Sequence, residues 1–193
     1  RYHNEVLHYQ RSADLSEVAV IGGGSFGTVI ANIIAENGYV VHFWMRSERL
    51  VSQVNRQHEN SEYLPGYSLG KRVVATQDMA KAVAGSSVVF VAVPSTSFRA
   101  VVKQIMKYAA PNVMLVSTTK GIEADSFMLM SEVLKAEAPA ARIGVLSGPN
   151  LAKEIAASQL TGSVIASSQE PVRSTIQELL KSDTFRVYTN DDV

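Results

Sequence analysis

Short apolar runs alternate along this chain with longer stretches in which apolar residues recur every three or four positions. The runs predict strands at residues 18–21, 39–45, 73–75, 88–93, 113–116, 143–146, 163–166 and 185–188. The periodic stretches predict helices at 28–37, 48–60, 78–84, 98–108, 126–137, 150–157 and 171–181. Because strands and helices alternate with connections of a few residues, the pattern predicts an α/β fold: a doubly wound, mostly parallel sheet with helices on both faces.

Three glycines separate the first predicted strand from the first predicted helix. Gly22, Gly24 and Gly27 fit the pattern G-x-G-x-x-G, with four apolar residues before it and an apolar helix after it. In this pattern the first glycine permits a tight turn, the second lets the backbone approach a pyrophosphate, and the third lets the helix pack on the strand. The glycines alone also occur in ordinary turns, but the strand and helix that flank them favour a nucleotide site of Rossmann type.

The end of the second predicted strand bears on the choice of cofactor. A site specific for NAD carries an acidic residue there, which holds the ribose 2′-hydroxyl. Here the position holds Met45-Arg46-Ser47. The Arg46 guanidinium can pair with a 2′-phosphate, and the Ser47 hydroxyl is a further donor. NADP is therefore allowed; the alternative is an exposed arginine that Glu48 neutralises.

Other polar residues and turns follow later strands, at the sheet edge where open α/β sheets bind ligands. Pro94 ends the strand at 88–93, and Lys120 lies between the strand at 113–116 and Gly121. Lys120 is placed to meet a phosphate or carboxylate, although a surface lysine is the common alternative. After the strand at 143–146, Gly148 allows close backbone approach, and Asn150 can cap a helix or bind a ligand.

Composition narrows the range of partners. The 193 residues include 18 basic and 18 acidic side chains and no cysteine. This balance gives no reason to expect nucleic acid or a membrane surface as partner, so we expect a small molecule. We find no apolar run of about 18 residues and no signal peptide, and we expect a cytoplasmic protein.

Residues 1–16 are polar and precede the first strand, so we interpret them as a tail or an added edge segment. His3 and His8 lie in this segment. Two histidines in such a segment could suggest a metal site, but solvated side chains are the commoner interpretation, and we predict no metal.

Several blocks in one order resemble a known family. They are Gly22-Gly23-Gly24-Ser25-Phe26-Gly27-Thr28, Phe43-Trp44-Met45-Arg46, Tyr63-Leu64-Pro65, Val91-Ala92-Val93-Pro94, Thr119-Lys120-Gly121-Ile122-Glu123, Ser147-Gly148-Pro149-Asn150-Leu151-Ala152-Lys153-Glu154 and Phe185-Arg186-Val187-Tyr188-Thr189-Asn190. Over about residues 17–193 the chain closely resembles bacterial NAD(P)-dependent glycerol-3-phosphate dehydrogenase. The resemblance implies hydride transfer between sn-glycerol 3-phosphate and dihydroxyacetone phosphate, for phospholipid synthesis, with NADP or NAD as cofactor.

The resemblance also implies roles for individual residues. Lys120 would contact both cofactor and substrate, and Gly148 and Asn150 would approach glycerol phosphate. The cofactor-binding set comprises Gly22, Gly24, Ser25, Phe26, Gly27, Arg46, Ser47, Tyr63, Pro94, Lys120 and Ala152. Phe26 departs from the family, which more often has Trp there, and Ser47 stands where a basic residue is common.

The family's proton-transferring lysine lies in a Gly-Ala-Leu-Lys-Asn block that follows Tyr-Thr-Asn-Asp, and this chain stops at Val193. We therefore expect a cofactor domain at 17–193 without the helical substrate domain, no catalytic residue in this chain, and no turnover by it alone. The full-length enzyme could be a homodimer. The alternatives are another dehydrogenase of this architecture, such as a ketopantoate reductase or a 6-phosphogluconate dehydrogenase type, and a non-catalytic NADP-binding sensor.

Overall fold

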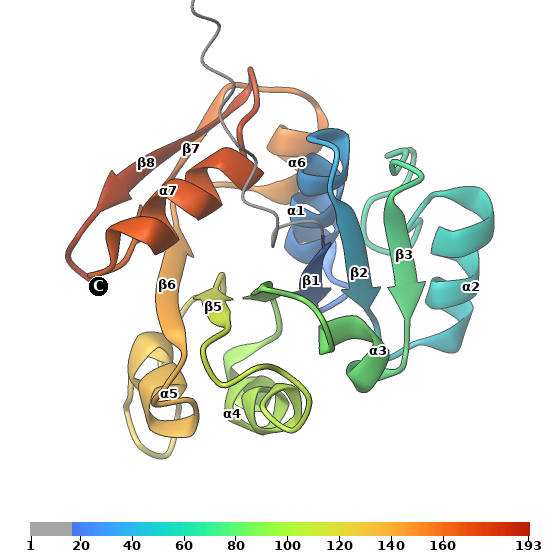
Figure 1. The fold of residues 1–193 in the computed structure, drawn as a ribbon. Coiled ribbons are helices and arrows are strands. Elements are labelled where there is room, and N and C mark those ends of the chain that lie inside the picture. The colour runs from blue at the N-terminus through green and yellow to red at the C-terminus, as the bar shows by residue number, and fades with distance from the viewer. Residues whose placement is uncertain (1–16) are drawn as a thin grey trace, which may run out of the picture.

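The computed structural model describes residues 17–193, and the predicted tail with His3 and His8 lies outside them. One eight-stranded sheet has the order β3-β2-β1-β4-β5-β6-β7-β8 (Figure 1). Its strands are β1 (Glu17–Ile21), β2 (Val40–Trp44), β3 (Val73–Thr76), β4 (Val88–Val91), β5 (Met114–Ser117), β6 (Arg142–Ser147), β7 (Thr161–Ala166) and β8 (Phe185–Asn190). All neighbouring strands are parallel except β6 and β7. The predicted mostly parallel sheet is thus confirmed.

Helices cover both faces of this sheet. On one face lie α1 (Ser25–Glu36), α2 (Glu48–Gln57), α6 (Ala152–Ala156) and α7 (Glu170–Leu179); on the other lie α3 (Met79–Val83), α4 (Ser95–Ile105) and α5 (Met130–Glu137). Figure 1 shows α3, α4 and α5 along the lower side of the sheet, with α1, α6 and α7 above it. β4 explains this arrangement, because Val88 and Phe90 enter one core and Val89 and Val91 the other. A strand buried on both faces must be apolar at every position.

The order of the first six strands indicates where a ligand would bind. The chain moves outward from β1 to β3 and then returns to the other side of β1 as β4. This is the order of dinucleotide-binding sheets, in which ligands lie beyond the carboxyl ends of the strands where the order reverses. The glycine turn after β1 lies at this reversal.

Helix ends differ from the prediction where local contacts override the apolar period. α5 begins at Met130 instead of residue 126, because Phe127 has left-handed backbone with φ 58° and Ile122 pairs with Leu129 as an isolated bridge. α2 ends at Gln57 instead of residue 60, because His58 is also left-handed. Most other ends shift by one or two residues. The exceptions are α1, which begins three residues early, and α4, which follows Pro94 directly and both begins and ends three residues early.

Within residues 17–193, none of the helices combines the length and the apolar character needed to cross a membrane.

Candidate dinucleotide site

Two glycines of the turn after β1 are closed in by backbone. Gly22 has φ +124°, and a Cβ there would lie 2.2 Å from the carbonyl oxygen of Ala92. A Cβ on Gly27 would lie 2.1 Å from the carbonyl oxygen of Gly22. Real Cβ atoms do not approach backbone so closely, so only glycine fits at either position. These glycines let β1, β4 and α1 meet.

Gly24 is different, because its surroundings are open. A Cβ there would have no heavy atom within 4 Å, and its φ of −76° suits any residue. Gly24 is the N-cap of α1, whose first N–H groups have no partner inside the helix and carry the positive end of its dipole. An anion is stabilised at such a helix end. The turn therefore fits a pyrophosphate at Gly24, with Ser25 and Phe26 beside it.

The loop at 58–70 is fastened to this turn. The amide nitrogen of Asn60 donates to the carbonyl oxygen of Gly23 at 3.0 Å and to the Thr28 hydroxyl at 2.8 Å. The Ser25 hydroxyl donates to the carbonyl oxygen of Tyr63 at 3.1 Å. The backbone of Tyr63 thus lies next to the glycine turn, and its side chain is 40% exposed. The sequence does not predict a role for Asn60, because an asparagine in a polar loop carries no signal of its partner 37 residues away.

The far end of this loop is fastened to α1 by Asn32. The Asn32 amide donates to the Tyr67 hydroxyl at 3.0 Å and accepts from the Gly70 N–H at 2.7 Å. Burial raises the pKa of Tyr67 above its ordinary value, with Glu36 adding to the rise and the Asn32 hydrogen bond opposing it. The loop is thus held at both ends against the helix that the glycine turn begins.

Arg46 and Ser47 lie at the carboxyl end of β2, next to the turn. Arg46 is exposed, and its carbonyl oxygen accepts a hydrogen bond from the Gln77 amide at 2.6 Å. The Ser47 hydroxyl accepts from the Leu50 N–H at 3.3 Å and so caps α2. This cap uses the Ser47 oxygen as acceptor and leaves its O–H able to donate to a ligand.

Pro94 and Lys120 lie at the same edge, beyond β4 and β5. Pro94 is the N-cap of α4, and Lys120 is exposed. The Thr119 hydroxyl donates to the carbonyl oxygen of Val93 at 2.7 Å, which ties the start of the Lys120 segment to the end of β4.

The predicted site residues after β6 lie close to β7. A Cβ on Gly148 would lie 2.8 Å from the carbonyl oxygen of Gly162, so Gly148 allows close approach to β7. Asn150 is only 7% exposed, and its amide donates to the Ser163 hydroxyl on β7. Ala152 is half-buried at the start of α6. The structure thus shows a packing role for Gly148 and Asn150. The Asn150 amide oxygen accepts no hydrogen bond from the residues at 17–193.

One cavity lies away from these residues. Its volume is about 300 Å³, and it is lined by Lys135, Pro139, Ala141, Ile143, Ser168, Gln169, Asp191 and Val193. None of these is a predicted site residue. We assign the site from the glycine turn instead, because a dinucleotide lies along an open sheet edge and does not need an enclosed cavity.

Comparison with known proteins agrees with this geometry. A family described as NAD-dependent glycerol-3-phosphate dehydrogenase N-terminus matches residues 17–172. The chain belongs to this family. A glycerol-3-phosphate dehydrogenase of Teredinibacter turnerae, named as NAD(P)+-dependent, is 51% identical over 175 residues, which are 91% of this chain and 52% of the relative.

Solved structures give the same family. The glycerol-3-phosphate dehydrogenase of Coxiella burnetii superposes with a TM-score of 0.87 at 30% identity, over 93% of this chain and 55% of that one. A ketopantoate reductase of Ralstonia eutropha, a relative of one alternative considered above, has a TM-score of 0.68 at 16% identity over 92% of this chain and 57% of that one. That likeness shows the fold alone. The chain spans about half the length of the glycerol-3-phosphate dehydrogenases it matches.

Proposed function

We propose that this chain is the NAD(P)-binding domain of an oxidoreductase that interconverts sn-glycerol 3-phosphate and dihydroxyacetone phosphate, for glycerophospholipid synthesis. The proposal rests mainly on how the surroundings of the three glycines in the turn differ. Gly22 and Gly27 are enclosed by backbone, whereas Gly24 is open at the N-terminus of α1. Family membership supplies the reaction class.

In this proposal the N–H groups from Gly24 to Phe26 hold the pyrophosphate. Arg46 and the Ser47 hydroxyl meet the ribose that carries the 2′-phosphate in NADP, and they do not exclude NAD. The residues proposed to line the rest of the cofactor are Tyr63, Pro94, Lys120 and Ala152. The bound nicotinamide would supply hydride transfer at its C4 atom.

Lys120 is the charged group that we propose faces both cofactor and substrate. Its ammonium would stabilise the negative charge of the substrate's phosphate or of its C2 oxygen. Gly148 and the Asn150 amide oxygen would approach the substrate from β6.

The remaining parts of the proposal lie beyond the site. We take residues 17–193 as one dinucleotide domain and assign proton transfer to a lysine in the half of the relatives that this chain does not match. We also propose a cytoplasmic location and a homodimeric full-length enzyme.

The full-length protein that contains this domain tests the proposal. Lys120→Ala should lower kcat/KM for reduction of dihydroxyacetone phosphate at least about tenfold, which is about 1.4 kcal/mol of transition-state stabilisation. The measurement is NADPH oxidation by absorbance, and Lys107→Ala, an exposed lysine that follows α4, is the matched control. No reduction of dihydroxyacetone phosphate by the wild-type protein would contradict the proposal and favour the sensor.

A further inference from the structure

The segment at 118–129 carries Lys120 from the end of β5 to the start of α5. Its beginning is fixed to β4, because the Thr118 and Thr119 hydroxyls donate to the carbonyl oxygens of Val91 at 3.2 Å and Val93 at 2.7 Å. These bonds hold the residues before Lys120. They do not hold the residues after it, where Gly121 has φ +100° and the chain turns away from the strand.

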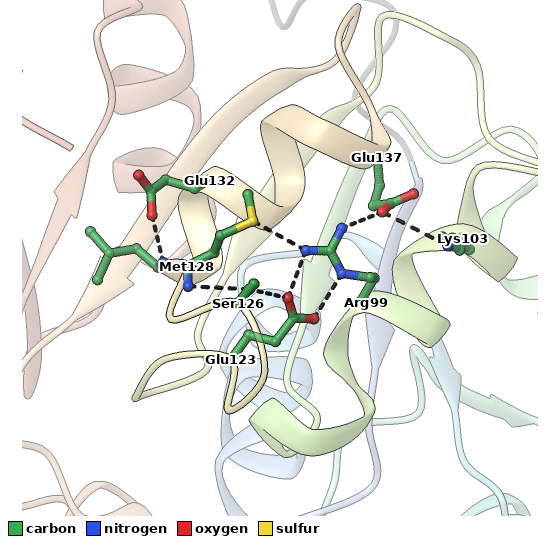
Figure 2. Close-up of polar contacts among 8 residues, drawn as sticks. Arg99, Lys103, Glu123, Ser126, Met128, Glu132 and Glu137 are labelled. Atoms are coloured by element: carbon green, nitrogen blue, oxygen red, sulfur yellow. Dashed lines mark hydrogen bonds and ion pairs between the residues drawn. The ribbon is translucent and has the colours of Figure 1, made fainter.

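A second anchor lies on the other side of Lys120. The Arg99 guanidinium, on α4, donates through Nε and Nη2 to the two carboxylate oxygens of Glu123, at 2.8 and 2.7 Å. Nη1 donates to Glu137 on α5, and Nη2 also contacts the Met128 sulfur at 3.3 Å. Figure 2 shows Arg99 between these three partners. One side chain thus joins α4, the segment and α5.

This contact differs from an ordinary surface ion pair. The side chains of Arg99, Glu123 and Glu137 are only 28%, 19% and 17% exposed. A bidentate arginine–carboxylate pair fixes orientation as well as distance, because the planar fork matches the two oxygens. Glu123 accepts a further hydrogen bond from the Ser126 hydroxyl. The carboxylate is therefore held from two sides.

The segment requires such a constraint. Phe127 has left-handed backbone with φ 58° although it is not a glycine, and its side chain is 74% exposed. Such a conformation persists only where neighbouring contacts fix it. Two of the contacts around it involve the backbone of Glu123, whose N–H donates to Met128 O and whose carbonyl oxygen accepts from Phe127 N, both at 2.9 Å.

We propose that Arg99 is a positioning residue, which holds Lys120 toward the substrate by clamping Glu123 three residues further along. This inference rests on the proposed role of Lys120. Lys120 lies between Thr119, tied to the strand β4, and Glu123, tied to the helix α4 that begins directly after that strand. Releasing the second tie frees the segment to move without disturbing the sheet.

A double-mutant cycle in the full-length protein tests the proposal. Arg99→Gln should lower kcat/KM for dihydroxyacetone phosphate about tenfold while KM for NADPH changes less than about twofold. In a Lys120→Ala background the same substitution should cost less than about twofold, because a residue that acts through Lys120 has nothing left to position. Equal losses in both backgrounds would overturn the proposal.

Lys103→Gln is the matched control. Lys103 approaches the same Glu137 carboxylate at 3.9 Å but has no ion pair with Glu123 among residues 17–193. Its removal should leave kcat/KM within about twofold of wild type. If Arg99→Gln fails to fold, Glu123→Gln replaces it, since this variant keeps the Arg99–Glu137 pair and should show the same coupling to Lys120.

Hydrogen exchange separates failure of this inference from failure of the proposed function. Amides at 120–129 should exchange at least about tenfold faster in Arg99→Gln than in wild type or Lys103→Gln, while β4 and β5 remain protected. Unchanged exchange in a folded Arg99→Gln variant would overturn the clamp whatever the reaction. Faster exchange in a protein without dehydrogenase activity would support the clamp and contradict the proposed function.

Discussion

The connections after β1 and after β5 reach the same sheet edge but are held by different forces. The turn after β1 is fixed by backbone sterics, because Gly22 and Gly27 leave no room for a side chain. The segment after β5 is held at its start by the Thr118 and Thr119 hydroxyls, and beyond Lys120 it is held by charge, through Arg99 and Glu123. A site on such an edge can thus combine a rigid cradle for the cofactor with a segment whose position depends on one ion pair.

This difference decides what the sequence reveals. The glycine turn can be recognised in the sequence, because a close backbone contact requires glycine and the glycines lie within six residues of one another. The Arg99 clamp is invisible, since Arg99 and Glu123 are 24 residues apart and each looks like a surface charge. The sequence also places the start of α5 four residues too early for this reason, because contacts with Glu123 hold Phe127 in left-handed backbone and override the apolar period.

The doubly wound, mostly parallel sheet could be predicted from the sequence for a similar reason. Apolar runs separated by amphipathic helices restrict the sheet to a few topologies, and the glycine turn selects among them. The role of Asn60 could not be predicted from the sequence, because its hydrogen bonds to Gly23 and Thr28 join segments that have no common sequence pattern. The packing of Asn150 on β7 was hidden likewise, since no local signal places β6 and β7 antiparallel.

The largest effect should come from adding a methyl group to the enclosed part of the turn. Gly22→Ala would place Cβ 2.2 Å from the Ala92 carbonyl oxygen at a φ of +124°. Both the clash and the backbone strain oppose folding, so we expect a loss of about 3 kcal/mol or more in the free energy of unfolding. Urea denaturation measures this loss, and a midpoint equal to that of wild type would show that the turn is not fixed by sterics.

A smaller, pH-dependent effect should come from the charged segment. The Arg99 guanidinium, with help from the Ser126 hydroxyl, lowers the pKa of Glu123 from 4.5 to about 2. A carboxylate with a lowered pKa stabilises the fold above its unfolded pKa, and this contribution is lost as pH falls toward the folded value. Glu123→Gln should therefore melt at a lower temperature than wild type at neutral pH, with the difference disappearing between about pH 4.5 and 2.

Thermal melts of the two proteins across this range measure that contribution. The Gly22→Ala defect should persist over the same range, because a steric clash does not titrate. A Glu123→Gln difference that stayed constant down to pH 2 would mean that the ion pair contributes nothing to the folded state.

The most direct test of the central claim is cofactor binding by Gly24→Ala. The open surroundings and ordinary φ of Gly24 leave room for a methyl group, and alanine is a poorer N-cap than glycine, so the free energy of unfolding should fall by no more than about 1 kcal/mol. The same methyl would stand where the backbone meets the pyrophosphate, so the dissociation constants of NADPH and NADH should both rise at least about tenfold, or about 1.4 kcal/mol. Gly70→Ala, whose Cβ would make only ordinary contacts at 3.6 Å, is the control and should bind as wild type does. Calorimetric titration of wild type, Gly24→Ala and Gly70→Ala measures these affinities. Equal affinities in all three, with Gly24→Ala fully folded, would contradict the assignment of the glycine turn as the dinucleotide site.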